Sequence, residues 1–104
     1  MTKTYYKLIR DRIPEIIASQ GKTCHTQTLD DCTYQQMLEK KLQEELNEYL
    51  ESKELEELAD LLEVIRAVVY AKGYTWEQLE TLRLEKTKQR GGFEKRLLLT
   101  QVIE

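Results

Sequence analysis

Apolar residues recur at helical spacing along most of the chain, and short polar breaks divide them into separate segments. The spacing predicts long helices over about residues 33–51, 54–72 and 76–90. A short helix is expected to begin after Asp11 and to end at Gly21. The motif Thr75-x-x-Gln78 has the pattern of a capping box and marks the start of the last helix. The chain is therefore predicted to be an all-α bundle of about four helices, in a single domain spanning residues 1–104.

Two segments outside these helices show weak strand character. Residues 22–29 are rich in Thr with slight alternation, and residues 96–102 include a run of apolar side chains. Together they allow a small two-stranded β element beside the helices. Asp31 or Thr33, which follow the first segment, are expected to cap the helix over 33–51.

The middle of the helix over 54–72 is apolar on most of its sides. Its apolar residues include Leu61, Leu62, Val64, Ile65, Val68 and Val69. A helix of this kind lies at the centre of a domain or in a subunit interface. We expect both here, and therefore a homodimer or a higher homo-oligomer. The apolar surface of this helix is more than a single domain of 104 residues can cover.

Two acidic clusters lie on either side of the polar break at Ser52-Lys53. Glu45 and Glu48 are spaced i, i+3 in the first cluster, and Glu57 and Asp60 are spaced alike in the second. Members of such a pair share one face of a helix. If the chain folds back at the break, residues whose numbers sum to 105 lie level, so Glu45 faces Asp60 and Glu48 faces Glu57. Four carboxylates this close would repel one another, and a cation bound by oxygen ligands, Mg²⁺ or Mn²⁺, is the natural resolution.

A second interpretation treats the acids as a solvated helix surface. Charged residues make up 34% of the chain, and pairs such as Glu44/Glu48 support exposed helices. Against this, Leu38 and Leu42 fall on the side of Glu45, and Asp60 is the lone acid in a run of apolar residues. The pattern alone leaves both interpretations open.

The charge distribution argues against nucleic acid and membrane partners. The net charge is −3 and the pI is about 5.3, although six of the fourteen residues from Arg83 to Arg96 are basic. No apolar run approaches the ~20 residues that span a bilayer, and no leader pattern is present, so a cytoplasmic location is expected. Cys24 and Cys32 are too few for a disulfide framework and are expected to be free thiols.

Three blocks of residues carry a resemblance to a known family. They are Lys41-x-x-Glu44-Glu45-x-x-Glu48 with Glu57-x-x-Asp60, the opening YKLIRDRIP at residues 6–14, and Lys86-x-x-x-Arg90-Gly91-Gly92-Phe93. In this order the blocks resemble the MazG-like, phosphoribosyl-ATP pyrophosphohydrolase-like branch of the all-α nucleoside triphosphate pyrophosphohydrolases. The resemblance covers nearly the whole chain. It departs from the family in the eight-residue spacer between Glu48 and Glu57, which is short, and in Arg12, where relatives often have Lys.

The resemblance implies Mg²⁺-dependent cleavage of a nucleoside triphosphate, or of a related nucleotide such as phosphoribosyl-ATP, to the monophosphate and pyrophosphate. Its metal ligands would be Glu45, Glu48, Glu57 and Asp60. Glu44 and Glu45 would be the catalytic residues, with Glu44 as a candidate general base. The phosphates would be held by Lys86 and Arg90, with Lys7 and Arg10 as further candidates. Relatives place the substrate between subunits, so residues of one chain would complete the site of another.

The alternative function belongs to a different class. A non-catalytic helical oligomerisation or adaptor module would have the same helices, and its acids would only solvate them. It would neither respond to Mg²⁺ nor depend on Asp60.

Overall fold

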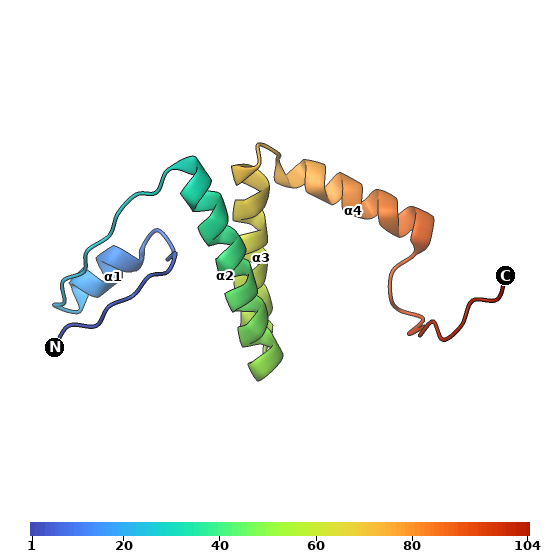
Figure 1. Ribbon diagram of the computed structural model, residues 1–104, viewed down its shortest axis with the longest axis horizontal. Coiled ribbons are helices and arrows are strands. Elements are labelled where there is room, and N and C mark those ends of the chain that lie inside the picture. Colours follow the sequence, from blue (N-terminus) through green and yellow to red (C-terminus); the bar gives the residue numbers. More distant parts are fainter.

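The computed structural model describes all 104 residues and contains four helices and no strand (Figure 1). The helices are α1 (Ile13–Ser19), α2 (Asp31–Ser52), α3 (Leu55–Ala71) and α4 (Trp76–Arg90). The all-α class is confirmed, and the predicted bounds of the three long helices are met within two residues. None of the helices combines the length and the apolar character needed to span a membrane.

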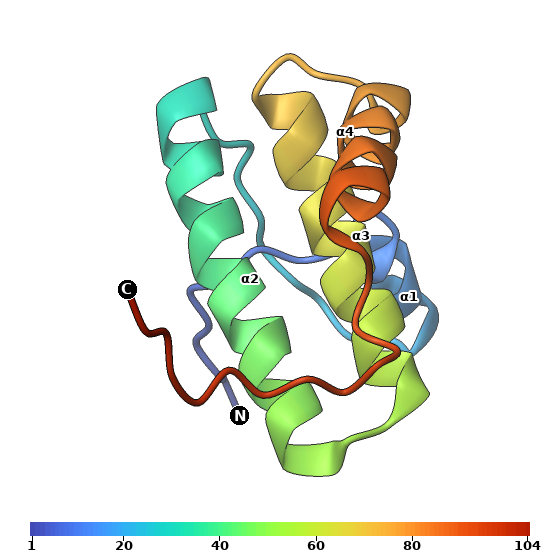
Figure 2. The same ribbon diagram turned by 90° about the vertical axis from the view of Figure 1, so that its right-hand side faces the viewer.

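Helices α2 and α3 form a tight antiparallel hairpin, which both views show (Figures 1 and 2). Only Lys53 and Glu54 connect them. Lys53 adopts the left-handed conformation with φ 63°, and its N–H donates to the carbonyl of Tyr49 at 2.7 Å. This bond satisfies one of the last carbonyls of α2 while the backbone reverses. The predicted fold-back at residues 52–53 is therefore correct to within a residue.

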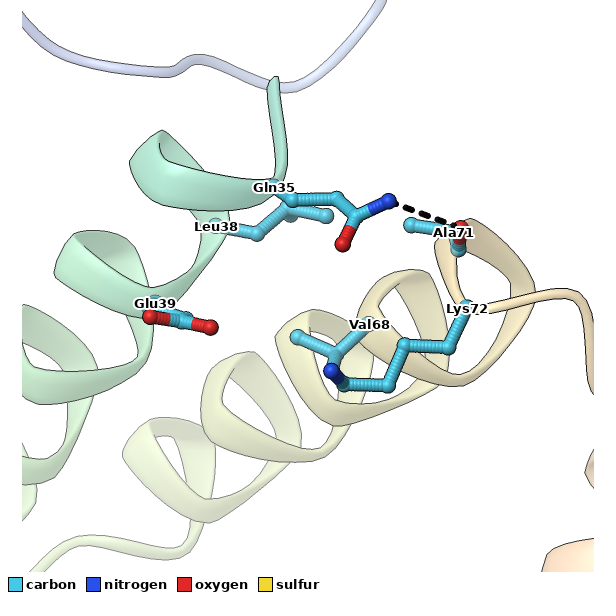
Figure 3. A pocket seen from close by; sticks show the side chains of 6 residues that line it. All are labelled: Gln35, Leu38, Glu39, Val68, Ala71 and Lys72. Atoms are coloured by element: carbon cyan, nitrogen blue, oxygen red, sulfur yellow. Dashed lines mark hydrogen bonds between the residues drawn. The ribbon is translucent and has the colours of Figure 1, made fainter. Parts of the chain in front are cut away.

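Apolar contact and one hydrogen bond hold the two helices together. Leu38 of α2 and Val64 of α3 are the two buried hydrophobic residues of the chain. Near the N-terminus of α2, the side-chain amide of Gln35 donates to the carbonyl of Ala71 at 3.3 Å (Figure 3). Beside this bond lies a cavity of about 10 Å³, lined in part by Leu38 and Val68 and large enough for no more than one water. The hairpin is thus closed at the end opposite its turn.

The helix starts follow ordinary capping chemistry, with one change from expectation. The carboxylate of Asp30, and not a side chain of Asp31 or Thr33, caps α2 by accepting from the N–H of Thr33 at 2.7 Å. The capping box of α4 is confirmed, because the Thr75 hydroxyl and the Gln78 side chain each accept from the other residue's N–H.

The predicted β element is not present. Residues 22–29 and 96–102 are not strands, and the two segments lie at opposite ends of the molecule (Figure 1). A weakly alternating segment forms a strand only where a second segment pairs with its backbone. Because α4 carries the C-terminal segment away from α1, neither segment has such a partner.

The chain is extended beyond the hairpin. Helix α4 packs on α3 alone, and α1 packs on none of the other helices. The radius of gyration is 18.5 Å, against about 13 Å for a compact chain of this length. Leu82 and Leu84 of α4, which helical spacing places on an inward face, are about half exposed. Apolar surface therefore remains uncovered on α4 and on the segment that follows it.

Replacing Leu38 tests whether the α2–α3 contact supplies the stability of the chain. Leu38→Ala is expected to lower the free energy of unfolding by about 2–5 kcal/mol, since Leu38 is 3% exposed and its removal leaves a cavity. Urea unfolding followed by circular dichroism at 222 nm measures this change. Leu55→Ala, at an exposed position on α3, is the control and should change stability by less than about 0.5 kcal/mol. Equal losses of stability in the two variants would show that the α2–α3 contact does not supply the stability of the chain.

Candidate metal centre

Three carboxylates from two helices meet on one side of the hairpin. Glu45 lies on α2, and Glu57 and Asp60 lie on α3. Each side chain offers one carboxylate oxygen, and these oxygens lie within 4.8 Å of one another. The i, i+3 spacing places Glu57 and Asp60 on one face of α3, and the two-residue turn sets that face against Glu45. The group could hold a metal ion.

Glu45 is the buried member of this group. It is 7% exposed and is the only charged residue buried in the chain. Its Oε1 lies 3.3 Å from the ammonium of Lys41, whereas its Oε2 has no hydrogen-bond partner. A buried carboxylate oxygen without a partner is costly, because it has lost its hydration without a replacement. A cation beside Oε2 of Glu45 would offset this cost.

The pKa of Glu45 responds to this environment. Desolvation raises the pKa above its ordinary value, the neighbouring Glu48 carboxyl raises it further, and the Lys41 ammonium opposes these effects. Folding therefore disfavours the ionised form of Glu45. A divalent cation beside the carboxylate would reverse this preference.

Repulsion within the group points the same way. Two unit charges 4.8 Å apart repel by about 3 kcal/mol at the effective dielectric constant of about 20 that suits protein sites. A divalent ion replaces each repulsion with attraction, and carboxylate oxygens suit hard cations such as Mg²⁺ and Mn²⁺. Because Mg²⁺–oxygen distances are about 2.1 Å, the three side chains would have to draw slightly closer together to share an ion.

The other two acids of the first cluster lie differently. Glu48, which the sequence predicts as a fourth ligand, is exposed and is not one of the three that meet. Glu44, the candidate general base, is partly exposed, and its carboxylate lies 3.6 Å from the ammonium of Lys41. The structure thus brings together three of the four predicted ligands and places Glu44 beside them on α2.

A cleft of about 440 Å³ opens beside the carboxylates, within the usual range for small-molecule sites. Residues 8–12 form one wall, and α2 and α3 supply the rest, including the buried side chains of Leu38 and Val64. Glu45 and Asp60 lie in its lining. Three cations and four acids line the cleft: Arg10, Arg12, Lys41, Asp11, Glu45, Asp60 and Glu63.

Of the four cations predicted to bind phosphate, Arg10 alone lines this cleft. Its guanidinium donates to Oδ1 of Asp60 at 2.8 Å. Lys7 lies outside the lining, with its ammonium 5.4 Å from the ring centroid of Tyr5. Lys86 and Arg90 are exposed on α4, which extends away from the hairpin (Figure 1).

Lys41 is the site residue whose role was not predicted. It belongs to the motif Lys41-x-x-Glu44-Glu45, where it lies between two acids and partners the buried Glu45. Its spacing of i, i+4 to Glu45 is the ordinary one for a helical ion pair, and this spacing is a signal that could have identified the contact.

Replacing Glu45 separates the effect of its buried charge on stability from its part in binding a metal ion. In EDTA, Glu45→Gln is expected to be more stable than the wild type by about 1 kcal/mol, because the buried charge is gone. Since the folded-state pKa lies above the unfolded one, this advantage should grow as the pH rises through the interval between them. Mg²⁺ should stabilise the wild type against unfolding and leave the variant unchanged.

Thermal unfolding at several pH values, in EDTA and in Mg²⁺, measures both effects. Glu51→Gln, at an exposed position on the same helix, is the control and should keep the response to Mg²⁺. A Glu45→Gln protein that Mg²⁺ still stabilises would show that the ion binds elsewhere.

Comparisons of the chain with protein-family models, with curated proteins and with solved structures found no match. The expected resemblance to MazG-like pyrophosphohydrolases therefore stays a prediction from the motif residues.

Proposed function

We propose that this protein is a Mg²⁺-dependent nucleotide pyrophosphohydrolase. Its substrate would be a nucleoside triphosphate, or a related nucleotide such as phosphoribosyl-ATP. The observation that carries the proposal is the buried, unpartnered carboxylate oxygen of Glu45, held beside Glu57 and Asp60. The cleft beside them is of a size that suits a small ligand.

In this proposal Glu45, Glu57 and Asp60 hold the metal ion. Glu48 lies one turn from Glu45 on the same helix, so a change of side-chain rotamer would bring it toward the group as a fourth ligand. When bound, Mg²⁺ neutralises phosphate charge and makes a water molecule a better nucleophile. Mn²⁺ has the same preference for oxygen ligands and is expected to substitute.

The reaction needs one water and no covalent intermediate. The water oxygen attacks the α-phosphorus, the bond from this phosphorus to the oxygen that bridges to the β-phosphorus breaks, and pyrophosphate leaves with that oxygen. Glu44 would accept the proton that the water loses, because it lies beside the ligands while remaining partly exposed. The ammonium of Lys41, 3.6 Å away, would orient the carboxylate for this role.

The cleft is suited to an anionic substrate once a divalent ion is present. Its acids outnumber its cations by one without metal, and Mg²⁺ would offset this excess negative charge. Arg10 is the cation of this chain best placed to contact a phosphate. Lys86 and Arg90 could contact the same phosphates only if α4 came from another chain or changed its position.

We propose that a second copy of the chain supplies this α4. The segment from Arg83 to Arg96 is basic, whereas the facing helices of the hairpin are strongly acidic around Glu45 and Asp60. The apolar side chains left exposed on α4 would be covered in the same contact. A homodimer of this kind would place the partner's cations beside the acids of each chain.

Pyrophosphate release tests the proposed reaction. With Mg²⁺, the wild type should release pyrophosphate from at least one member of a panel of NTPs, dNTPs and phosphoribosyl-ATP, and EDTA should abolish the release. Asp60→Asn should lower kcat at least about 100-fold, because it removes a charged metal ligand. Glu51→Gln serves as the matched control and should retain full activity.

A wild type that is folded and binds Mg²⁺ but hydrolyses no member of the panel would refute the reaction. The function would then be sought among oligomerisation or adaptor modules, which the exposed apolar residues of α4 also suit.

Oligomeric state and complementation test the proposed partner. Light scattering should give at least twice the chain mass of 12.4 kDa. Asp60→Asn chains coexpressed with Lys86→Ala/Arg90→Ala chains should recover about a quarter of wild-type activity, since half of the dimers are mixed and each mixed dimer has one intact site. Each variant expressed alone should be nearly inactive. A monomeric wild type, or coexpressed chains with no recovery, would contradict the shared site.

A further inference from the structure

A single ion pair joins distant parts of the chain, and it uses a candidate metal ligand. Arg10 lies 2.8 Å from Oδ1 of Asp60, fifty residues away in the sequence. The other ion pairs all link residues three or four apart on one helix or at its start. The Arg10–Asp60 pair therefore attaches the N-terminal segment to α3.

This attachment builds one wall of the candidate substrate cleft. Residues 8–12 line the cleft opposite the helices, and no backbone hydrogen bond ties these residues to α2 or α3. The guanidinium of Arg10 is the one charged group of the segment that is paired with the hairpin. The Arg10–Asp60 pair is thus one of the contacts that hold this wall, beside the half-buried Leu8 and Ile9, and it uses a carboxylate that the metal ion would also use.

Two of the three candidate ligands already carry a cation. Lys41 partners Glu45, and Arg10 partners Asp60, whereas Glu57 has no ion pair. The two cations differ in how firmly they are held. Lys41 is on the same helix as Glu45 and is 18% exposed, but Arg10 is 59% exposed and lies outside the helices. Exposed pairs are weak, so Arg10 is the cation that a metal ion would displace more easily.

We infer that Arg10 acts as a metal-responsive latch: it occupies Asp60 in the metal-free protein, and the binding of a divalent ion displaces it and loosens residues 8–12. The inference rests on the proposed metal centre. Displacement has a second effect, because the freed guanidinium remains at the cleft, where it can pair with an anionic ligand. Metal and anion would then bind with positive coupling through one side chain.

Mg²⁺ titration of the full-length chain by calorimetry tests the latch. Because Arg10 competes with the metal ion for Asp60, Arg10→Ala should bind Mg²⁺ about two- to fivefold more tightly than the wild type, the range that an exposed ion pair allows. Arg12→Ala is the matched control. Arg12 lines the same cleft and carries the same charge, but it pairs with Glu15 and not with a ligand. It reports how much affinity changes when any positive charge is lost nearby, and the effect of Arg10→Ala must exceed it.

Backbone ¹⁵N relaxation provides a readout that does not depend on affinity. In the wild type, Mg²⁺ should lower the order parameters of residues 8–12, whereas in Arg10→Ala these should be low with or without Mg²⁺. Two results would overturn the latch while leaving the metal centre in place: weaker Mg²⁺ binding by Arg10→Ala, or equal tightening in the two variants. Failure of the wild type to bind Mg²⁺ would overturn both the latch and the proposed metal centre.

Discussion

The register between α2 and α3 is the constraint on which the other features depend. A turn of two residues fixes this register, and contact between Leu38 and the helix that carries Val64 maintains it. Glu45 is buried because the register sets it against α3, and it meets Asp60 for the same reason. The hairpin thus stabilises the fold and at the same time concentrates negative charge, and the repulsion between these charges opposes its stability.

Two cations of the chain offset part of this repulsion, and they act from different places. Lys41 offsets part of the charge of Glu45 from within the same helix, and Arg10 offsets part of that of Asp60 from outside it. Neither cation satisfies Oε2 of Glu45. A protein that only needed a stable hairpin could replace Glu45 with an apolar residue at little cost. The packing of the hairpin therefore does not require the carboxylate of Glu45, which a bound cation could use.

Local chemistry could be predicted from the sequence, and long-range arrangement could not. The capping box at Thr75 and the fold-back after Ser52 depend on neighbouring residues, and the structure confirms both. The meeting of Glu45 with Asp60 followed from helix period and turn position alone. The predicted β element is absent, and Leu82 is exposed although helical spacing favours an inward position, because each would require a contact with a remote segment. The role of Arg10 was only weakly indicated for the same reason.

The two-residue turn also limits how this chain can vary. Most surface loops accept insertions, because added residues loop out into solvent without moving the elements that they connect. Here one residue added to the start of α3 would rotate the facing surface by about 100° and carry Asp60 away from Glu45. Changes of length at Lys53 and Glu54 should therefore be as disruptive as changes of a ligand, which makes this short loop part of the site even though it lies outside the cleft.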